Sequence, residues 1–282
     1  MGQAKVKKSR FLERHPICCY CGGGTPATTE DHFPPRGIFR EHKWPEGHVF
    51  PACSECNNGM ADDEAIMSLL CRVRLGDQVD VEEIEFSRQV RALAERRPDL
   101  IAAMRPGPSQ VKKWLRNRGL SLGPGESTER VPILSLEHPD IRKAIRLFAT
   151  KLFCSLYYKH AGRVLGATGR ILHNIKTNGD LTAPAPLEGT EELFQSMPLL
   201  KRNNETLNDQ FFYSYGALDD WSQAAFFACF RHGLAMTAIV VEDGDLDAED
   251  LSSPKVLMPF NWRRPLQSQP PTGGDQPFAA HG

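Results

Sequence analysis

The sequence has no run of about 18 apolar residues, the length that a helix needs to cross a membrane, so no membrane span is expected. Its first residues include no apolar segment of the kind found in a secretory signal. The formal net charge is only −1, which gives no overall attraction for nucleic acid or for acidic membranes. We also find no internal repeat. These absences favour a cytoplasmic protein with no membrane partner, and they leave the oligomeric state open.

Disulfide bonds are not expected either, although the chain has eight cysteines. Disulfide-rich proteins are usually short and secreted, whereas this chain has 282 residues. Four of the cysteines form two C-x-x-C pairs, Cys18 with Cys21 and Cys53 with Cys56, and Cys19 is expected to point away. One tight turn can deliver two thiolates to a tetrahedral ion, so the two pairs predict a structural zinc site. The alternative is four incidental reduced cysteines.

Positive charge is concentrated in two stretches despite the near-zero sum. Residues 1–14 carry five Lys or Arg against one acid, and residues 139–176 carry eight against one. Basic surfaces are therefore expected locally.

The sequence predicts an α+β fold in three parts. Residues 1–75 would form the zinc-stabilised module, residues 76–262 a helical segment and an α+β region of unknown role, and residues 263–282 a disordered tail. Up to about residue 59 we expect turns and short strands. Hydrophobic periodicity predicts helices beginning with an N-cap at Asp62 and over 81–97, 109–118 and 139–160. Strands are predicted over 130–136, 211–215, 224–230 and 234–241.

Two of these elements allow both a functional and a plain structural interpretation. The helix over 139–160 would place four basic residues off its apolar face: Arg142, Lys143, Arg146 and Lys151. They would either bind nucleic-acid phosphates or be ordinary solvated charges. The strand over 211–215 carries four aromatic residues that could stack on bases, although core packing is the simpler explanation: Phe211, Phe212, Tyr213 and Tyr215.

Between the two cysteine pairs stands the run Asp31-His32-Phe33-Pro34. Adjacent residues of a strand point to opposite faces, and a turn can also splay them apart. One of Asp31 and His32 could thus hold a cation while the other faces a substrate. An Asp-His pair is common by itself, and its position between the cysteine pairs is what makes it informative.

The run from Cys18 to Glu64 resembles the HNH endonuclease family with four zinc-binding cysteines, part of the ββα-metal (His-Me finger) nucleases. These proteins share C-x-x-C, then Asp-His followed by an apolar residue and Pro, then Asn or His ahead of a second C-x-x-C-Asn. The corresponding residues here are Cys18, Cys21, Asp31-His32-Phe33-Pro34, His48, Cys53, Cys56 and Asn57. The match covers about a sixth of the chain.

The resemblance implies a role for each position. His32 would be the general base that takes a proton from the attacking water, since neutral imidazole has a suitable pKa near neutral pH. Asp31 and Asn57 would hold one Mg²⁺ or Mn²⁺, a hard cation that suits oxygen ligands. That cation would bind the scissile phosphate and neutralise the leaving 3′ oxygen, so the products would carry a 5′-phosphate and a 3′-hydroxyl.

Several positions stay open. His48 stands where the family usually has Asn, and it could brace the loop, act as a second catalytic acid–base group, or bind metal. Asn58 competes with Asn57 as a ligand, although the spacing of nine residues from His48 favours Asn57. Three basic residues of the intervening loop are candidate contacts to nucleic-acid phosphates, or merely solvated charges: Arg36, Arg40 and Lys43.

The first hypothesis is therefore a metal-dependent endonuclease that acts on nucleic acid, most readily DNA, through His32, Asp31 and Asn57. A second hypothesis is a non-catalytic, zinc-stabilised nucleic-acid-binding module. A third is an RNA-cleaving HNH enzyme.

Overall fold

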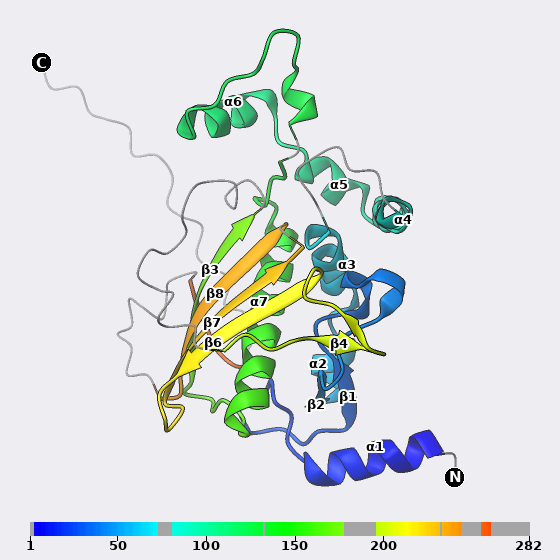
Figure 1. Cartoon of the computed structure of the whole chain (residues 1–282), viewed down its shortest axis with the longest axis vertical. Helices are drawn as coiled ribbons and strands as arrows, with labels where there is room; N and C mark the ends of the chain where they lie inside the picture. The colour runs from blue at the N-terminus through cyan, green and yellow to red at the C-terminus, as the bar shows by residue number, and fades with distance from the viewer. Residues whose placement is uncertain are drawn as a thin grey trace, which may run out of the picture.

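The computed structural model describes residues 3–72, 81–131, 133–177, 196–231, 233–243 and 255–260. Helices and strands are mixed in an α+β arrangement, as the sequence predicts (Figure 1). The tail over 263–282, predicted to be disordered, lies outside the described residues.

The cysteine-rich segment folds as a hairpin followed by a helix. Strands β1 (Thr29–His32) and β2 (Val49–Ala52) pair antiparallel, and α2 (Ser54–Asn58) follows directly. The connection between the strands contains two single 3₁₀ turns, η1 (Arg36–Ile38) and η2 (Arg40–His42). Two strands and a helix thus follow one another in the segment between and beside the cysteine pairs.

Five of the described helices lie outside this hairpin, and the last two of them stand at the far upper end of the molecule (Figure 1). They are α1 (Gln3–Arg14), α3 (Ala61–Leu70), α4 (Val81–Arg96), α5 (Pro98–Met104) and α6 (Pro108–Asn117). A 3₁₀ turn, η3 (Thr128–Arg130), precedes the long helix α7 (Pro139–Ala161). Pro139 stands in the first turn of α7, and Gly162 ends the helix with a φ of 71°, a left-handed conformation that glycine adopts readily.

The C-terminal half is built on an antiparallel five-stranded sheet of order β6-β7-β8-β3-β9. Its strands are β3 (Arg170–Thr177), β6 (Phe211–Ala217), β7 (Gln223–Phe230), β8 (Leu234–Val241) and β9 (Val256–Leu257). A separate small hairpin joins β4 (Lys201–Arg202) to β5 (Glu205–Thr206). Helix α7 packs against the sheet and also against α3, so it lies between the sheet and the N-terminal part (Figure 1).

One hydrophobic core runs through both halves. Phe33, just after β1, packs against Phe148 of α7 with ring centroids 5.0 Å apart, and Phe148 packs against Phe230 of β7 at 5.5 Å. The same buried cluster includes cysteines of the N-terminal part and residues of β6 to β9. The N-terminal part is therefore stabilised by the C-terminal part as well as by its own contacts.

Most predicted elements are confirmed, including the helices over 81–97, 109–118 and 139–160 and the last three strands. The strand over 130–136 is wrong: residue 130 ends η3, and among described residues 131 and 133–136 no strand partner is present. The prediction of turns and short strands is also wrong for the first residues, because Gln3–Arg14 form the basic helix α1. Helix α3 begins at Ala61 with Met60 at its N-cap, not with Asp62.

Candidate metal centre and candidate active site

The two C-x-x-C pairs come together. The sulfur atoms of Cys18, Cys21, Cys53 and Cys56 all lie within 4.8 Å of one another. The Cys21 sulfur is 3.3 Å from that of Cys56 and 3.7 Å from that of Cys53. Four thiolates at zinc-bond distance from one ion would be about 3.8 Å apart. The cluster therefore fits a tetrahedral metal ion such as zinc, and Cys19 is buried but outside it.

Local structure explains why the four sulfurs converge. Gly22 follows Cys21 with a φ of +62°, which lets the first knuckle turn sharply. In the second knuckle the Cys53 sulfur accepts a hydrogen bond from the Cys56 backbone N–H at the start of α2. Hydrogen bonds from the Cys21 and Cys56 thiols lower the pKa of Cys18, so this sulfur favours the thiolate form that binds metals.

His32 stands at the end of β1, partly exposed. Its Nε2 atom is 3.1 Å from a guanidinium nitrogen of Arg36, and its ring meets the Trp44 ring edge-on at 4.7 Å. A guanidinium can only donate, so Nε2 carries the lone pair and the ring is neutral. Burial and then the Arg36 charge lower the pKa of His32, which favours the same neutral form. This is the form in which imidazole can accept a proton.

Asp31 points to the other side of β1 and is only 5% exposed. Its carboxylate pairs with the ammonium of Lys151 on α7 at 2.7 Å, and this ammonium also pairs with Glu64 of α3 at 3.0 Å. Lys151 is 0% exposed. The sequence expectation that Lys151 lies off the core face of its helix is therefore wrong, because the ammonium is buried between two carboxylates.

Asn57 lies on the Asp31 side of β1. Its side-chain amide donates to the Thr29 hydroxyl at 2.8 Å and to the Glu30 carbonyl at 3.2 Å, which fastens α2 to β1. Thr29 and Asp31 share a face of the strand, whereas His32 points away from it. As the two residues stand, Asp31 and Asn57 do not fit a divalent cation, because the Asp31 carboxylate is already neutralised by a buried ammonium. The competing residue, Asn58, is exposed.

His48 is a packing residue in this structure. It is 1% exposed and lies among the rings of Phe50, Phe211 and Tyr213 at about 6 Å. Its Nδ1 is 3.3 Å from the Glu46 carbonyl, and burial lowers the pKa of the ring to about 3. The catalytic assignment of His48 has no support in this position, because substrate cannot reach an enclosed ring. Its backbone carbonyl accepts from the Phe33 N–H, in keeping with a loop brace.

The three predicted phosphate contacts separate into two groups. Arg40 pairs with Asp209, and Lys43 pairs with Glu41 and Glu205 at 2.8 and 3.1 Å. Only Arg36, which contacts His32, forms no ion pair with a carboxylate among the residues that the structure describes. Arg36 is consequently the strongest of the three candidates for a phosphate contact.

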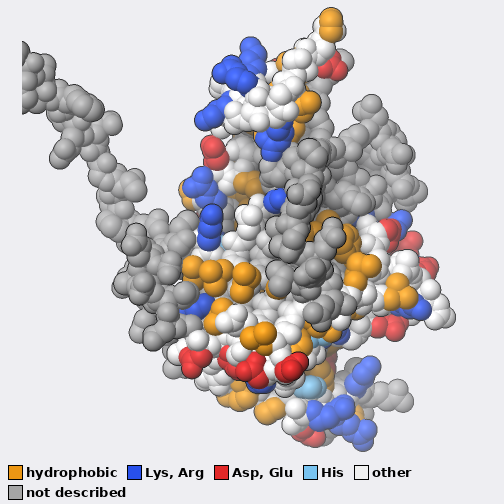
Figure 2. All heavy atoms as spheres, turned by 60° about the vertical axis from the view of Figure 1, so that its left-hand side comes forward, with side chains coloured by type: hydrophobic (Ala, Val, Ile, Leu, Met, Phe, Trp, Pro, Cys, Tyr) orange, Lys and Arg blue, Asp and Glu red, His pale blue; other side chains and the backbone are white. Residues whose placement is uncertain are grey.

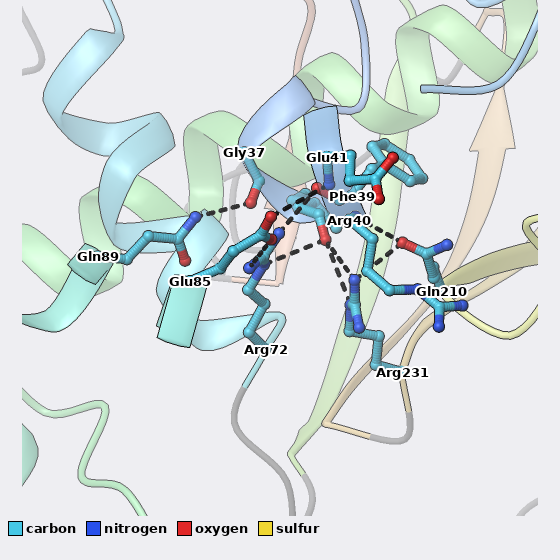
Figure 3. Close-up of polar contacts among 10 residues, drawn as sticks. Gly37, Phe39, Arg40, Glu41, Arg72, Glu85, Gln89, Gln210 and Arg231 are labelled. Atoms are coloured by element: carbon cyan, nitrogen blue, oxygen red, sulfur yellow. Dashed lines mark hydrogen bonds and ion pairs between the residues drawn. The ribbon is translucent and has the colours of Figure 1, made fainter. Parts of the chain in front are cut away.

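Side chains from distant elements hold the loop that carries Arg36 (Figure 3). Three successive carbonyls of residues 37–39 each accept hydrogen bonds. Gln89 donates to the Gly37 carbonyl at 2.8 Å, and Arg231 donates to that of residue 38 at 3.1 Å. Arg72 donates to the carbonyls of residues 38 and 39 at 3.3 and 2.8 Å. Sequence reasoning missed these residues. For Arg72 and Arg231 the one signal is a charged residue just after an apolar run, and no such signal marks Gln89.

The other basic and aromatic candidates have ordinary positions. Phe211 and Tyr213 are fully buried, which confirms core packing for that strand. Arg142 and Lys143 are exposed on α7, and Lys143 pairs with Asp63 at 3.5 Å. Figure 2 shows Lys and Arg side chains gathered over α6 at the upper end of this face and over α1 at its lower end. Local basic surfaces thus exist over α6 and α1 on this face (Figure 2).

Comparison with protein-family models, curated proteins and solved structures finds no match for this chain. None of the described helices is both long enough and apolar enough to span a membrane. The functional argument therefore depends on the residues themselves: a four-cysteine cluster, a neutral imidazole beside an arginine, and a buried carboxylate–lysine–carboxylate group.

Proposed function

We propose that this chain is an endonuclease of the HNH type that hydrolyses phosphodiester bonds in nucleic acid, with DNA as its main substrate and His32 as the general base. The supporting observation is the state of His32, a neutral and partly exposed imidazole whose Nε2 accepts from Arg36. His32 stands at the end of β1. One cysteine pair of the cluster precedes this strand in the sequence, and the other follows its partner strand β2.

Arg36 connects the base to the phosphate. Its guanidinium can turn from Nε2 to a phosphate oxygen when nucleic acid binds, and Nε2 is then free to accept a proton from water. A guanidinium presents N–H groups in a fork that matches phosphate oxygens. It would also face the negative charge that develops on the phosphate during attack, which is where a fixed cation accelerates the reaction most.

The proposal relies on one metal, the ion of the four-cysteine cluster. Zinc in the four-cysteine cluster would join the start of β1 to the start of α2 and so fix the hairpin that presents His32. The Mg²⁺ or Mn²⁺ implied at Asp31 and Asn57 stays a prediction of the resemblance. To bind there, a cation must first displace the Lys151 ammonium from Asp31.

The same ion pair favours the rival function, a zinc-stabilised nucleic-acid-binding module without catalysis. Incubation of purified protein with plasmid DNA and with RNA, in Mg²⁺, in Mn²⁺ and without added divalent cation, separates the possibilities. We expect cleavage of DNA by the wild type and a rate lower by about 10²–10⁴-fold for His32→Ala, the usual contribution of a general base. Equal cleavage by both, or binding with no cleavage under any of these conditions, would overturn the catalytic proposal. Faster cleavage of RNA would reassign the substrate.

The pH dependence of cleavage should report the Arg36–His32 contact. A base works only when deprotonated, so the rate falls as the pH drops through the pKa of His32. Because burial and Arg36 lower that pKa, the wild type should stay active below the ordinary range of histidine. Arg36→Gln removes the positive neighbour, raises the pKa of His32 and should move this acid limb to higher pH. Arg40→Gln, on the same loop but paired with Asp209, should leave the limb in place. An acid limb that does not move in Arg36→Gln would contradict this role.

A further inference from the structure

Two arginines from distant parts of the chain stack on one tryptophan beside His32. The guanidinium carbon of Arg36 lies 3.8 Å from the Trp44 ring centroid, and that of Arg202 lies 4.1 Å from it. Trp44 in turn meets the His32 ring at 4.7 Å. Within the described part of the chain neither arginine forms an ion pair with a carboxylate, unlike the neighbouring Lys43, which has two.

The position of Arg202 is built by the hairpin of β4 and β5. Asn203 and Asn204 connect the two strands with φ angles of 49° and 68°, the left-handed pair that a two-residue type I′ turn requires. Asparagine tolerates this conformation better than most residues do. The turn therefore sets the direction in which the hairpin presents Arg202.

The hairpin is fastened to the loop that carries Trp44. The Lys201 carbonyl accepts from the Glu46 N–H at 2.9 Å, and the Asn203 N–H donates to the Glu46 carboxylate at 3.1 Å. An ion pair between Lys43 and Glu205 adds a third contact at 3.1 Å. Arg202 is thus held beside Trp44 by contacts on both sides of it in sequence.

Two guanidinium groups on one indole lie within about 8 Å of each other and repel, and stacking on the ring offsets only part of that cost. An arrangement of this kind is completed by an anion. Guanidinium groups present paired N–H donors that match the oxygens of a phosphate. The anion would lie within reach of His32, because the ring of His32 contacts the same indole on which both guanidinium groups stack.

We propose that Arg36, Trp44 and Arg202 form a clamp for one phosphodiester group of a nucleic-acid backbone. Arg202 brings the C-terminal region into the site as a phosphate-binding residue, and Trp44 holds the two guanidinium groups in place. The identity of the anion rests on the proposed nuclease function, whereas the clamp itself rests on the geometry of the three side chains.

Binding of a short fluorescein-labelled DNA duplex to the full chain, measured by anisotropy without added Mg²⁺ or Mn²⁺, tests the clamp. Arg202→Gln should weaken binding about tenfold, as expected for loss of a charge-assisted hydrogen bond, and should lower the slope of log affinity against log salt by about one. Arg202→Lys keeps the charge but loses the planar stack, so its affinity should fall between those of the wild type and Arg202→Gln. The matched control is Lys201→Gln, an exposed charge on the same hairpin, which should change affinity less than about twofold.

Equal losses in Arg202→Gln and Lys201→Gln, or a wild type that does not bind the duplex, would overturn the clamp. Plasmid cleavage measured on the same proteins separates this result from the fate of the nuclease proposal. If no protein cleaves but only the Arg202 variants bind weakly, the clamp stands and the nuclease proposal fails. If the wild type cleaves and Arg202→Gln binds as well as Lys201→Gln does, the nuclease proposal stands and the clamp fails.

Discussion

Replacing Cys53 with serine is expected to abolish metal binding by the four-cysteine cluster and to unfold the segment that carries β1, β2 and α2. A structural zinc ion contributes about 10–16 kcal/mol to the folding of a small unit, which equals or exceeds the free energy of unfolding of most domains. Serine is an instructive replacement because its hydroxyl can still accept the Cys56 N–H that the Cys53 sulfur accepts now. Loss of structure would therefore report the metal and not the helix cap.

Zinc content by elemental mass spectrometry and the midpoint of urea unfolding measure this effect. Cys19→Ala is the matched control, because it removes a buried thiol of the same knuckle that lies outside the cluster. That variant should keep one zinc per chain and lose only the stability expected for a small buried group. If the Cys53→Ser protein retains one zinc per chain and an unchanged midpoint of urea unfolding, the four-cysteine zinc site is wrong.

Unfolding of this segment should spread into the C-terminal half. Phe33 contacts Phe148 of α7, and Phe148 contacts Phe230 of the sheet, so the two halves share one set of buried rings. Release of β1 would expose the α7 face that carries Phe148. A single cooperative transition is therefore expected in the wild type, although the sequence suggests a boundary near residue 75.

The metal centre could be predicted from the sequence because its determinants are local. Two C-x-x-C pairs deliver sulfur ligands through short turns, and the structure brings all four sulfurs together. The long helix α7 and the strands β6, β7 and β8 were also predictable, because their apolar residues follow the period of a helix or of a strand.

The surroundings of the catalytic candidates could not be predicted, because they depend on residues far away in the chain. The partner of Asp31 is Lys151, which in the sequence resembles any other lysine on an amphipathic helix. Arg202 belongs to a hairpin of two-residue strands, too short to show a period, and it reaches Trp44 only through tertiary contacts. Pairing and burial at such distances are properties of the fold and not of any local pattern.

These distant partners give the C-terminal half a role in the candidate site. Arg231 holds the loop that carries Arg36 from one side, while Arg72 holds it from the end of α3. The β4–β5 hairpin adds Arg202 beside Trp44, and α7 supplies Lys151 to Asp31. The site is consequently assembled from distant parts of the chain, and a fragment limited to the first 75 residues would lack three of these four contacts.

Replacing Lys151 with methionine is expected to lower the free energy of unfolding by about 3–5 kcal/mol, the usual cost of removing one partner from a buried ion pair. Methionine has a similar length and fills the space beside the Tyr20 and Phe33 rings, so a cavity contributes little. The cost arises because Asp31 and Glu64 are left without a counter-ion. Lys143→Met on the same helix removes a 3.5 Å pair from a half-exposed side chain and should cost less than about 1 kcal/mol.

The pH dependence of this cost distinguishes lost charge pairing from lost packing. Burial already raises the pKa of Glu64, and removal of the ammonium should raise it further. A carboxyl group with a higher pKa in the folded state binds its proton more tightly there, so the variant gains stability as the pH falls. In the wild type, burial lowers the pKa of Lys151, but the charges of Asp31 and Glu64 outweigh burial and raise this pKa above 10.5. The lysine therefore stays charged at acidic and neutral pH, and its protonation adds no pH dependence to the free energy of unfolding there. The difference between wild type and Lys151→Met should therefore shrink as the pH is lowered from neutral to mildly acidic.

Neutralising the carboxylates as well completes the test. Adding Asp31→Asn and Glu64→Gln to Lys151→Met removes all three charges while keeping the shapes of the side chains. If uncompensated charge is the cause, this triple variant should recover most of the lost stability and lose its dependence on pH, because no buried charge remains to be solvated. A triple variant as unstable as Lys151→Met, with the same stability at both pH values, would assign the cost to packing. Recovery would show that the Lys151 ammonium, carried by α7, is the buried cation that neutralises Asp31. The resemblance expects a divalent metal ion at this carboxylate instead.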